Sequence, residues 1–304
     1  MKTKLLSVFL FSIFVSTANA QTWFPFNQGS NSDVNAVVTD TVNNILYMGG
    51  YFTFADGSPA SHIAQWNGSG WTPLGVGVNS YVRALAMYNG ELYVGGDFTT
   101  AGGIPARGIA KWNGSTWFAV DSGFDNDVYC LTVFNGELYA GGQFFYSGNT
   151  SANMIAKYNG TAWSALGLGL NGRVQDIAVY NAELYVGGDG FSTAGGNPAM
   201  RIAKWDGANW SALGSGMGGI NPAVNGMYSC NGYLYAGGNF ATAGGNTAKN
   251  IAKWNGTVWA GEGNGIDAVV RAVYRYNGEL YVGGAFTTAS NNTVTVLKIT
   301  KWSG

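Results

Sequence analysis

Short apolar, β-branched runs alternate along this chain with Asn-Gly and Gly-Gly dipeptides, and the alternation repeats at a fixed interval. The pattern is clearest at residues 92–117, which read LYVGGDFTTAGGIPARGIAKWNGSTW. Its LYxGG core stands at Leu46, Leu92, Leu138, Leu184, Leu234 and Leu280, so successive copies are 46, 46, 46, 50 and 46 residues apart. The IAKW core or a close variant follows in step at Ile63, Ile109, Ile155, Ile202, Ile251 and Ile299. A period of this length predicts an array of units that bury their apolar faces against their neighbours.

Each unit contains four segments with strand character, which in unit two are 82–88, 91–98, 108–112 and 116–120. The first two are joined by Asn89-Gly90, a dipeptide that favours the type I′ hairpin turn because both positions require positive φ. The Gly95-Gly96 pair in the second segment leaves room for another part of the chain to approach closely. Four short antiparallel strands joined in this way are typical of a propeller blade.

Six copies of the unit predict an all-β fold, a six-bladed β-propeller of four-stranded antiparallel blades. The segment 22–26 has the character of a fourth strand without its own blade, and the chain ends at 299–304 on a third strand without a fourth. We therefore expect the N-terminal strand to complete the last blade and close the ring, which would leave few exposed strand edges.

The first twenty residues have the pattern of a signal peptide. Lys2 and Lys4 precede an apolar run at 5–15, and Ala18-Asn19-Ala20 offers small residues for cleavage. We expect a signal peptide at 1–20 and the propeller at 21–304. No later run approaches the ~20 apolar residues that span a bilayer, so we expect export without a membrane span, to the extracellular space, the cell surface or the periplasm.

The repeats resemble those of a known group of proteins. LYVGG(D/N)FT, then NIAKWNG, then W-x-x-LG-x-G-x-N-x-x-V is similar to the repeats of the fungal cortical cell-polarity markers and of related exported bacterial proteins, within the wider kelch and galactose-oxidase-type propeller group. The resemblance covers residues 21–304 and implies a propeller fold. Because this chain has no membrane span, the role of the fungal markers at a cell cortex is not carried over.

The charge of the chain argues against a nucleic-acid-binding protein, and the positions of its two cysteines argue against a disulfide bond. Without Lys2 and Lys4, 13 Lys and Arg stand against 16 Asp and Glu, a net charge near −3, whereas nucleic-acid binders normally present a basic face. Cys130 and Cys230 occupy equivalent strands of units three and five, with a whole unit between them. Since bridged Cα atoms lie within about 7 Å, we expect two free, buried thiols.

Residues that recur in every unit are interpreted as structural. This set includes all eleven tryptophans, which hold either the IAKW position (Trp66, Trp112, Trp205, Trp254, Trp302) or the fourth-strand position (Trp23, Trp71, Trp117, Trp163, Trp210, Trp259). It also includes the hairpin glutamates (Glu91, Glu137, Glu183, Glu279) and the third-strand lysines (Lys111, Lys157, Lys204, Lys253, Lys301).

Few residues remain for catalysis. His62 is the single histidine, which excludes a galactose-oxidase copper site, because copper prefers several imidazole ligands. We expect no cofactor, no metal and no catalytic residues. Asp176 and Glu262 replace apolar residues of the repeat, and a lyase or glycoside hydrolase that uses such carboxylates is the alternative. The acidic run 121–127 could offer calcium ligands, although it lacks the spacing of a known calcium loop and is interpreted as a solvated turn.

One position of the repeat holds different polar or amphipathic residues from unit to unit, although it always follows a valine. It follows a valine at the start of the first strand of each unit and reads Asn35, Arg83, Tyr129, Gln175, Asn225 and Arg271. These side chains are predicted to ring one mouth of the central channel, on the face that carries the longer loops, where binding residues commonly lie. Closure of the ring would bring Arg271, Asn35 and Arg83 together, and an anion or sugar site is one interpretation. Hydration of a water-filled channel is the other.

The sequence thus favours a secreted, non-enzymatic, monomeric binding scaffold for a glycan, peptide or protein partner. A purely structural surface or matrix protein is a further alternative, because the units are so similar to one another.

Overall fold

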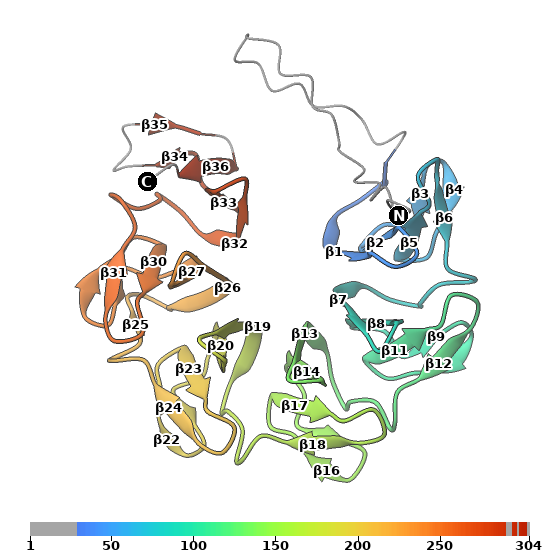
Figure 1. Cartoon of the computed structure of the whole chain (residues 1–304), viewed down its shortest axis with the longest axis horizontal. Helices are drawn as coiled ribbons and strands as arrows, with labels where there is room; N and C mark the ends of the chain where they lie inside the picture. The colour runs from blue at the N-terminus through green and yellow to red at the C-terminus, as the bar shows by residue number, and fades with distance from the viewer. Residues whose placement is uncertain (1–28, 290–293, 297, 303–304) are drawn as a thin grey trace, which may run out of the picture.

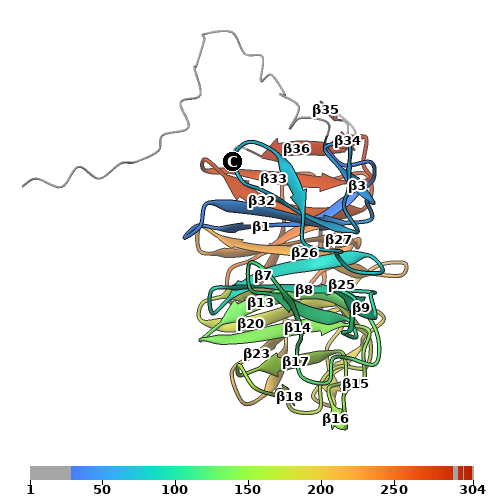
Figure 2. The ribbon, with the colours of Figure 1, turned by 90° about the vertical axis from the view of Figure 1, so that its right-hand side faces the viewer.

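The computed structural model describes residues 29–289, 294–296 and 298–302, and these residues form strands and turns without a helix. Six groups of antiparallel strands lie in an arc around a common axis, and two neighbouring groups are joined into one sheet, which gives five main sheets (Figure 1). Seen edge-on, the innermost strands run across the thickness of the disc, so that their two ends lie at its two faces (Figure 2). The prediction of an all-β, propeller-like arrangement is confirmed.

Three sheets have four strands each, and one eight-stranded sheet combines two further groups of four. These five groups are named blades 1 to 5, and the strands of each are given from the innermost outwards. Their strands are β1 (Val34–Asp40), β2 (Ile45–Gly50), β5 (Ile63–Trp66) and β6 (Trp71–Pro73); β7 (Val82–Tyr88), β8 (Glu91–Gly96), β11 (Ile109–Trp112) and β12 (Trp117–Ala119); β13 (Val128–Phe134), β14 (Glu137–Gly142), β17 (Ile155–Tyr158) and β18 (Trp163–Ala165); β19 (Arg173–Tyr180), β20 (Glu183–Asp189), β23 (Ile202–Trp205) and β24 (Trp210–Ala212); β26 (Ala223–Cys230), β27 (Tyr233–Asn239), β30 (Ile251–Trp254) and β31 (Trp259–Gly261). The backbone pair Asp189 and Ala223 links blades 4 and 5.

The last sheet, named sheet 6, has three strands among the described residues: β32 (Val270–Tyr276), β33 (Glu279–Gly284) and β36 (Ile299–Trp302). The prediction of six four-stranded blades is therefore correct for five of them. The segment 22–26, predicted as the fourth strand of the last blade, lies outside the described residues, and so does the predicted signal peptide at 1–20.

A small outer hairpin accompanies each sheet between its second and third main strands. The six hairpins are β3 (Phe54–Ala55) with β4 (Ser58–Pro59), β9 (Thr100–Ala101) with β10 (Ile104–Pro105), β15 (Tyr146–Ser147) with β16 (Thr150–Ser151), β21 (Thr193–Ala194) with β22 (Asn197–Pro198), β28 (Thr242–Ala243) with β29 (Asn246–Thr247), and β34 (Thr288–Ala289) with β35 (Val294–Thr295). In unit five, β25 (Met217–Gly218) pairs with β28. These hairpins lie in segments that the sequence predicted to be loops.

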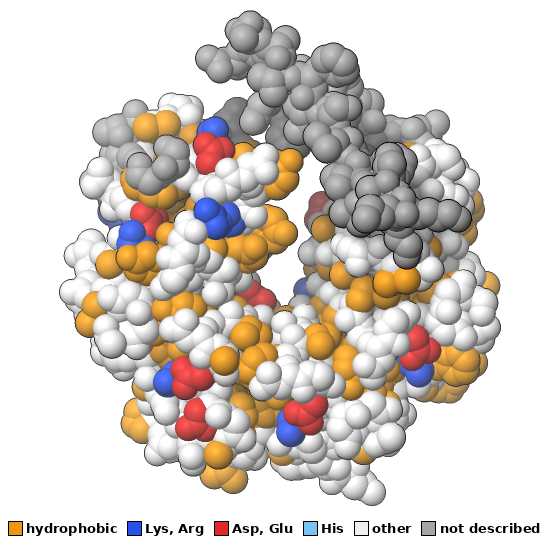
Figure 3. Space-filling model, in the orientation of Figure 1, with side chains coloured by type: hydrophobic (Ala, Val, Ile, Leu, Met, Phe, Trp, Pro, Cys, Tyr) orange, Lys and Arg blue, Asp and Glu red, His pale blue; other side chains and the backbone are white. Residues whose placement is uncertain are grey.

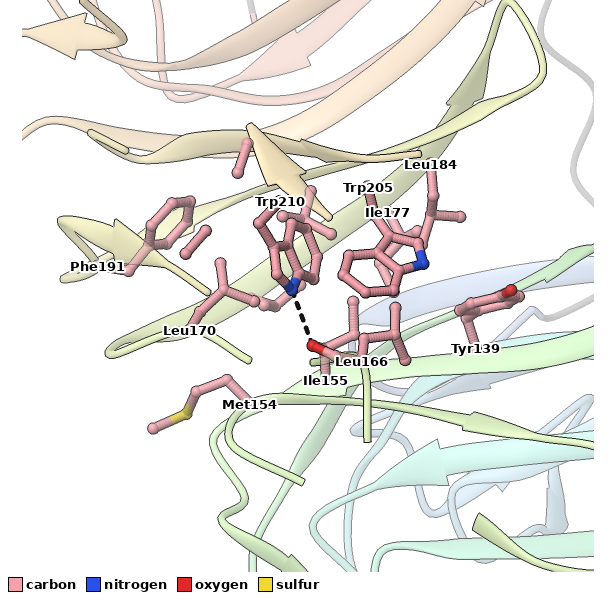
Figure 4. Packing of buried hydrophobic residues seen from close by; sticks show 14 of the residues in the cluster. Tyr139, Met154, Ile155, Leu166, Leu170, Ile177, Leu184, Phe191, Trp205 and Trp210 are labelled. Carbon is pink, nitrogen blue, oxygen red and sulfur yellow. Dashed lines mark hydrogen bonds between the residues drawn. The ribbon is translucent and has the colours of Figure 1, made fainter. Parts of the chain in front are cut away.

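The apolar core lies between consecutive sheets. In the cluster between blades 3 and 4, the indole Nε1 of Trp210 donates a 2.8 Å hydrogen bond to the Leu166 carbonyl oxygen of the preceding blade (Figure 4). Trp117 makes the same 2.8 Å bond to Leu74, and Trp259 a 3.2 Å bond to Leu213. These indoles join one blade to the next, which confirms the structural interpretation of the fourth-strand tryptophans in blades 2, 4 and 5.

Glycine and valine also lock neighbouring sheets together. The first glycine of each LYxGG motif in blades 1 to 5 has no room for a β-carbon, because a valine from the next innermost strand lies against it. The pairs are Gly49 with Val82, Gly95 with Val128, Gly141 with Val174, Gly187 with Val224 and Gly237 with Val270. The sequence predicted that the Gly-Gly pair leaves room for another part of the chain, and this part is the valine of the next blade.

Candidate functional site

The six predicted site residues occupy one structural position. In every sheet the pairing between the two innermost strands skips one residue after the valine. The skipped residues are Asn35, Arg83, Tyr129, Gln175, Asn225 and Arg271. Each is a β-bulge residue, and a bulge redirects the side chain away from the regular faces of the sheet.

Two more variable positions accompany each bulge. One directly precedes the valine and the other directly follows the Gly-Gly pair, and in blades 1 to 3 and sheet 6 a backbone hydrogen bond joins them. In blade 2, for example, the Asp97 amide donates to the Tyr81 carbonyl oxygen at 3.0 Å. We call the three positions a rim triple: Asp33, Asn35 and Tyr51; Tyr81, Arg83 and Asp97; Asp127, Tyr129 and Gln143; Arg173, Gln175 and Asp189; Ala223, Asn225 and Asn239; Val269, Arg271 and Ala285. Only the bulge position was predicted from the sequence.

Arg83 is the centre of a network across blades 1 to 3. Its Nη2 lies 2.7 Å from Oδ2 of Asp97, and its Nε donates to Oδ1 of the same carboxylate. Its Nη1 donates to the Tyr51 hydroxyl at 3.3 Å, and its guanidinium lies 4.9 Å from the centre of the Tyr129 ring. The bidentate hydrogen bonds to Asp97 raise the pKa of Arg83, so this cation stays charged at any physiological pH.

The network continues into blade 4. The Tyr129 hydroxyl donates to Oε1 of Gln143 at 2.8 Å. Arg173 lies 2.7 Å from the Asp189 carboxylate, which also accepts a 3.1 Å hydrogen bond from Gln175. The Arg173 side chain also hydrogen-bonds the Tyr129 side chain of blade 3. Rim triples 1 to 4 therefore form a continuous polar and aromatic network.

Three rings extend the network at the boundary of blades 1 and 2. The Tyr51 and Tyr81 rings lie 4.2 Å apart at 43°, and His62 meets Tyr81 edge-on at 5.6 Å. Burial lowers the pKa of His62, so its imidazole is neutral at pH 7. The His62 ring thus packs against the Tyr81 ring.

Asp127 is a further carboxylate of the network. Burial, and then the nearby Asp97 carboxylate, raise its pKa. Among the described residues, no donor makes a hydrogen bond to the Asp127 side chain. It is an acceptor in the network that remains available to a ligand.

The other three predicted site residues make different contacts. Asn35 and Asn225 each donate a 2.9 Å hydrogen bond to a carbonyl oxygen of the next innermost strand, at Val82 and Val270. Arg271 is exposed, beside Val269 and Ala285 of its own triple. Asn35 lies next to the Arg83 strand, but β1 and β32 stand at opposite ends of the arc (Figure 1). Of the predicted set Arg271, Asn35 and Arg83, the structure brings together only the last two.

The off-pattern carboxylates have structural partners. Asp176 accepts hydrogen bonds from the Ile177 amide at 2.8 Å and from the Met227 amide of blade 5 at 2.6 Å. Burial raises its pKa to about 7. Glu262 lies 3.0 Å from Lys253, and unit five has Tyr233 where units two, three, four and six have the hairpin glutamate.

The regular glutamates and lysines, which the sequence predicted to be structural, form ion pairs in blades 2, 3 and 4 and in sheet 6. The pairs are Glu91 with Lys111, Glu137 with Lys157, Glu183 with Lys204 and Glu279 with Lys301. Figure 3 shows one face of the disc, on which acidic and basic side chains occur mostly as adjacent couples among uncharged ones.

The acidic run 121–127 is built as a set of turns. Asp125 accepts hydrogen bonds from the Phe145 and Tyr146 amides, and Asp121 accepts one from the Trp163 amide at 3.1 Å. In the part of the chain that the structure describes, no three metal-ligating side chains cluster. Cys130 and Cys230 are free thiols, the first buried and the second half-buried.

The fold defines this chain as a β-propeller-like protein. The residues of its rim triples differ from blade to blade. The extracellular domain of a protein described as a one-component system of B. thetaiotaomicron matches it with a TM-score of 0.56 and 13% identity, over 86% of this chain and 33% of that one. This chain therefore spans about a third of the length of that extracellular domain, and at this identity the likeness concerns the fold alone.

Two further structures match with a TM-score of 0.47. A computationally designed protein, Ika8, is 15% identical over 87% of this chain and 83% of its own. The extracellular domain of a protein described as a hybrid two-component system of B. thetaiotaomicron is 12% identical over 84% and 37%. No protein-family model matches the chain, and no curated protein matches its sequence. The resemblance to the fungal markers and the kelch group stays a prediction. Among the described residues, no helix is long and apolar enough to cross a bilayer.

Proposed function

We propose that this protein is an exported, non-enzymatic binding propeller, and that rim triples 1 to 4 hold its ligand, a glycan, peptide or protein partner. One observation carries the proposal. Positions that recur from unit to unit hold the blades together, whereas the rim positions at one end of the innermost strands differ between units, and in triples 1 to 4 their side chains form a single network. Export is supported by the signal-peptide pattern of the first twenty residues.

We further propose that the ring is closed, with segment 22–26 completing sheet 6. Val34 is 42% exposed, whereas its equivalents Val82, Val128, Val174, Val224 and Val270 are fully buried. Gly283, which should receive Val34, has nothing nearer to a β-carbon than the Lys298 carbonyl oxygen at 3.9 Å. Trp302 is also 37% exposed. Val34 at one end of the arc and Gly283 at the other would fit together as valine and glycine do at the five other boundaries.

The enzymatic alternative has less support. Asp176 lies on the innermost strand of blade 4, while Glu262 follows the outermost strand of blade 5. Each is held by a partner of its own, the Met227 amide in one case and Lys253 in the other. A pair of carboxylates acting on one glycosidic bond would have to face a shared space.

The test is binding by the secreted chain to panels of glycans, peptides and cell-surface extracts, followed by Arg83→Ala. Loss of Arg83 removes the centre of the network and should weaken binding at least about tenfold. Lys111→Ala is the matched control, because it breaks an ion pair of similar exposure at the other end of β8 and should leave binding unchanged. Equal effects of the two substitutions would reject the rim as the site.

A further inference from the structure

The sector of the rim formed by blades 1 to 3 contains a partly exposed aromatic ring, that of Tyr81. Tyr81 is 43% exposed, and its ring is supported by Tyr51 and by the edge of His62. A tyrosine that neighbours already hold in place loses little conformational entropy when a ligand packs on it. The ring therefore offers a rigid apolar surface beside polar groups.

The charges of the network argue against an acidic ligand. Both arginines, Arg83 and Arg173, are already paired with carboxylates at 2.7 Å. Two cations and four carboxylates (Asp33, Asp97, Asp127 and Asp189) give rim triples 1 to 4 a net charge of 2 − 4 = −2. A phosphate, sulfate or carboxylate group would be repelled, or would have to displace an existing ion pair.

The hydrogen-bonding groups favour a ligand rich in hydroxyls. The Asp127 carboxylate is an available acceptor, and the Gln143 amide, whose Oε1 is taken by Tyr129, has an amino group that can donate. A hydroxyl both donates and accepts, and the C–H face of a sugar ring packs well on an aromatic ring. Tyr81 and Asp127 belong to adjacent triples, on blades 2 and 3.

We propose that this sector binds a neutral sugar residue of a glycan, with Tyr81 as the stacking surface and Asp127 as an acceptor for its hydroxyls. The proposal rests on the proposed binding function and narrows it to one class of ligand. A basic ligand attracted by the net charge is the competing outcome in the test.

The probes are immobilised neutral polysaccharides (β-glucan, α-mannan, xylan and galactan), acidic polygalacturonate and basic chitosan. Binding to at least one neutral polysaccharide is expected. Tyr81→Ala should weaken it by about tenfold or more, and Tyr81→Phe, which keeps the stacking surface, by less than about threefold. Tyr146→Ala is the control, since Tyr146 is 52% exposed on the outer hairpin of blade 3, and its affinity should equal that of the wild type.

Other outcomes separate this inference from the proposed function. Binding to polygalacturonate or chitosan alone, or neutral binding that Tyr81→Ala leaves unchanged, would overturn the sugar assignment. Binding of a peptide or protein that is sensitive to Arg83→Ala, with no polysaccharide bound, would overturn it as well while supporting the binding function. Unchanged thermal stability of Tyr81→Ala shows that a loss of affinity comes from the site.

Discussion

The side chain of Val82 in blade 2 packs directly on the Cα of Gly49 in blade 1, in the space that a β-carbon would fill. The same contact recurs at four further boundaries between sheets. Packed interiors tolerate neither added nor missing volume without cost. A single methyl group added at the glycine should therefore change the free energy of unfolding if the two sheets are in contact there.

Gly95→Ala should destabilise the boundary between blades 2 and 3. The new methyl carbon would stand 2.7 Å from Cγ1 and 3.3 Å from Cβ of Val128, and valine has little rotamer freedom with which to yield. Overpacking of this kind costs about 1 to 3 kcal/mol, which chemical unfolding can measure. The double variant with Val128→Ala should lose less than the sum of the two single losses, because it removes the clash. Additive losses would contradict direct contact.

Gly283→Ala tests whether the ring is closed. If Val34 packs on Gly283, the substitution should cost about as much as Gly95→Ala, about 1 to 3 kcal/mol. In an open arc the site has room, and an alanine in place of glycine would stabilise the chain by about 0.4 to 1 kcal/mol through the unfolded state. The two arrangements thus differ in the sign of the change in melting temperature. A variant that melts higher than the wild type would contradict closure.

Much of the fold was predictable because it repeats. Asn89 and Gly90 both have positive φ, 50° and 78°, as the dipeptide at that hairpin indicated. The outer hairpins were missed because 99–107 shows no alternation of apolar and polar residues. Gly102-Gly103, with φ of 59° and 82°, was nevertheless a hairpin signal, since glycine pairs favour the same class of turn.

The candidate site was predictable only in part. Comparison of units identified the bulge position, because its residues vary beside a constant valine. The residues that meet it could not be assigned without the strand register. Arg83 with Asp97, Tyr129 with Gln143 and Gln175 with Asp189 are each 14 residues apart. That constant separation is the signal in the sequence that could have identified the rim position after each Gly-Gly pair as the partner of the bulge position.

Asp176 should make stability depend on pH. Burial raises its pKa from 3.8 to about 7 in the folded protein, so the folded state holds the proton more tightly than the unfolded state. This contribution is fully present below about pH 4 and is lost as the pH rises through about 7. Urea unfolding should therefore show the wild type losing about 2 to 4 kcal/mol between pH 4 and pH 8 relative to Asp176→Ala. Alanine is the natural control, because Ala36, Ala84 and Ala272 occupy the same position in other sheets. Parallel pH profiles for the two proteins would contradict a buried, proton-binding Asp176.

Lys253→Ala should be far more damaging than Lys111→Ala. Glu262 is buried, with its carboxylate 3.0 Å from Lys253, whereas the Glu91 carboxylate that pairs with Lys111 is partly exposed. Removal of Lys253 leaves a buried charge without compensation, at a cost of about 3 to 5 kcal/mol, while loss of the more exposed pair costs under about 1 kcal/mol.

Glu262→Leu provides the matched background for that comparison, because Leu74, Leu166 and Leu213 hold the same position in other blades. In this background Lys253→Ala removes only the contact of the ammonium with the Tyr233 ring, 5.2 Å away, and should cost about 0.5 to 1 kcal/mol. The double-mutant cycle, measured by urea unfolding, isolates the coupling between the two side chains. A loss for Lys253→Ala that is the same with Glu262 and with Leu at this position would show that the pair is not coupled. Glu262 would then require another explanation, and the enzymatic alternative would regain a candidate residue.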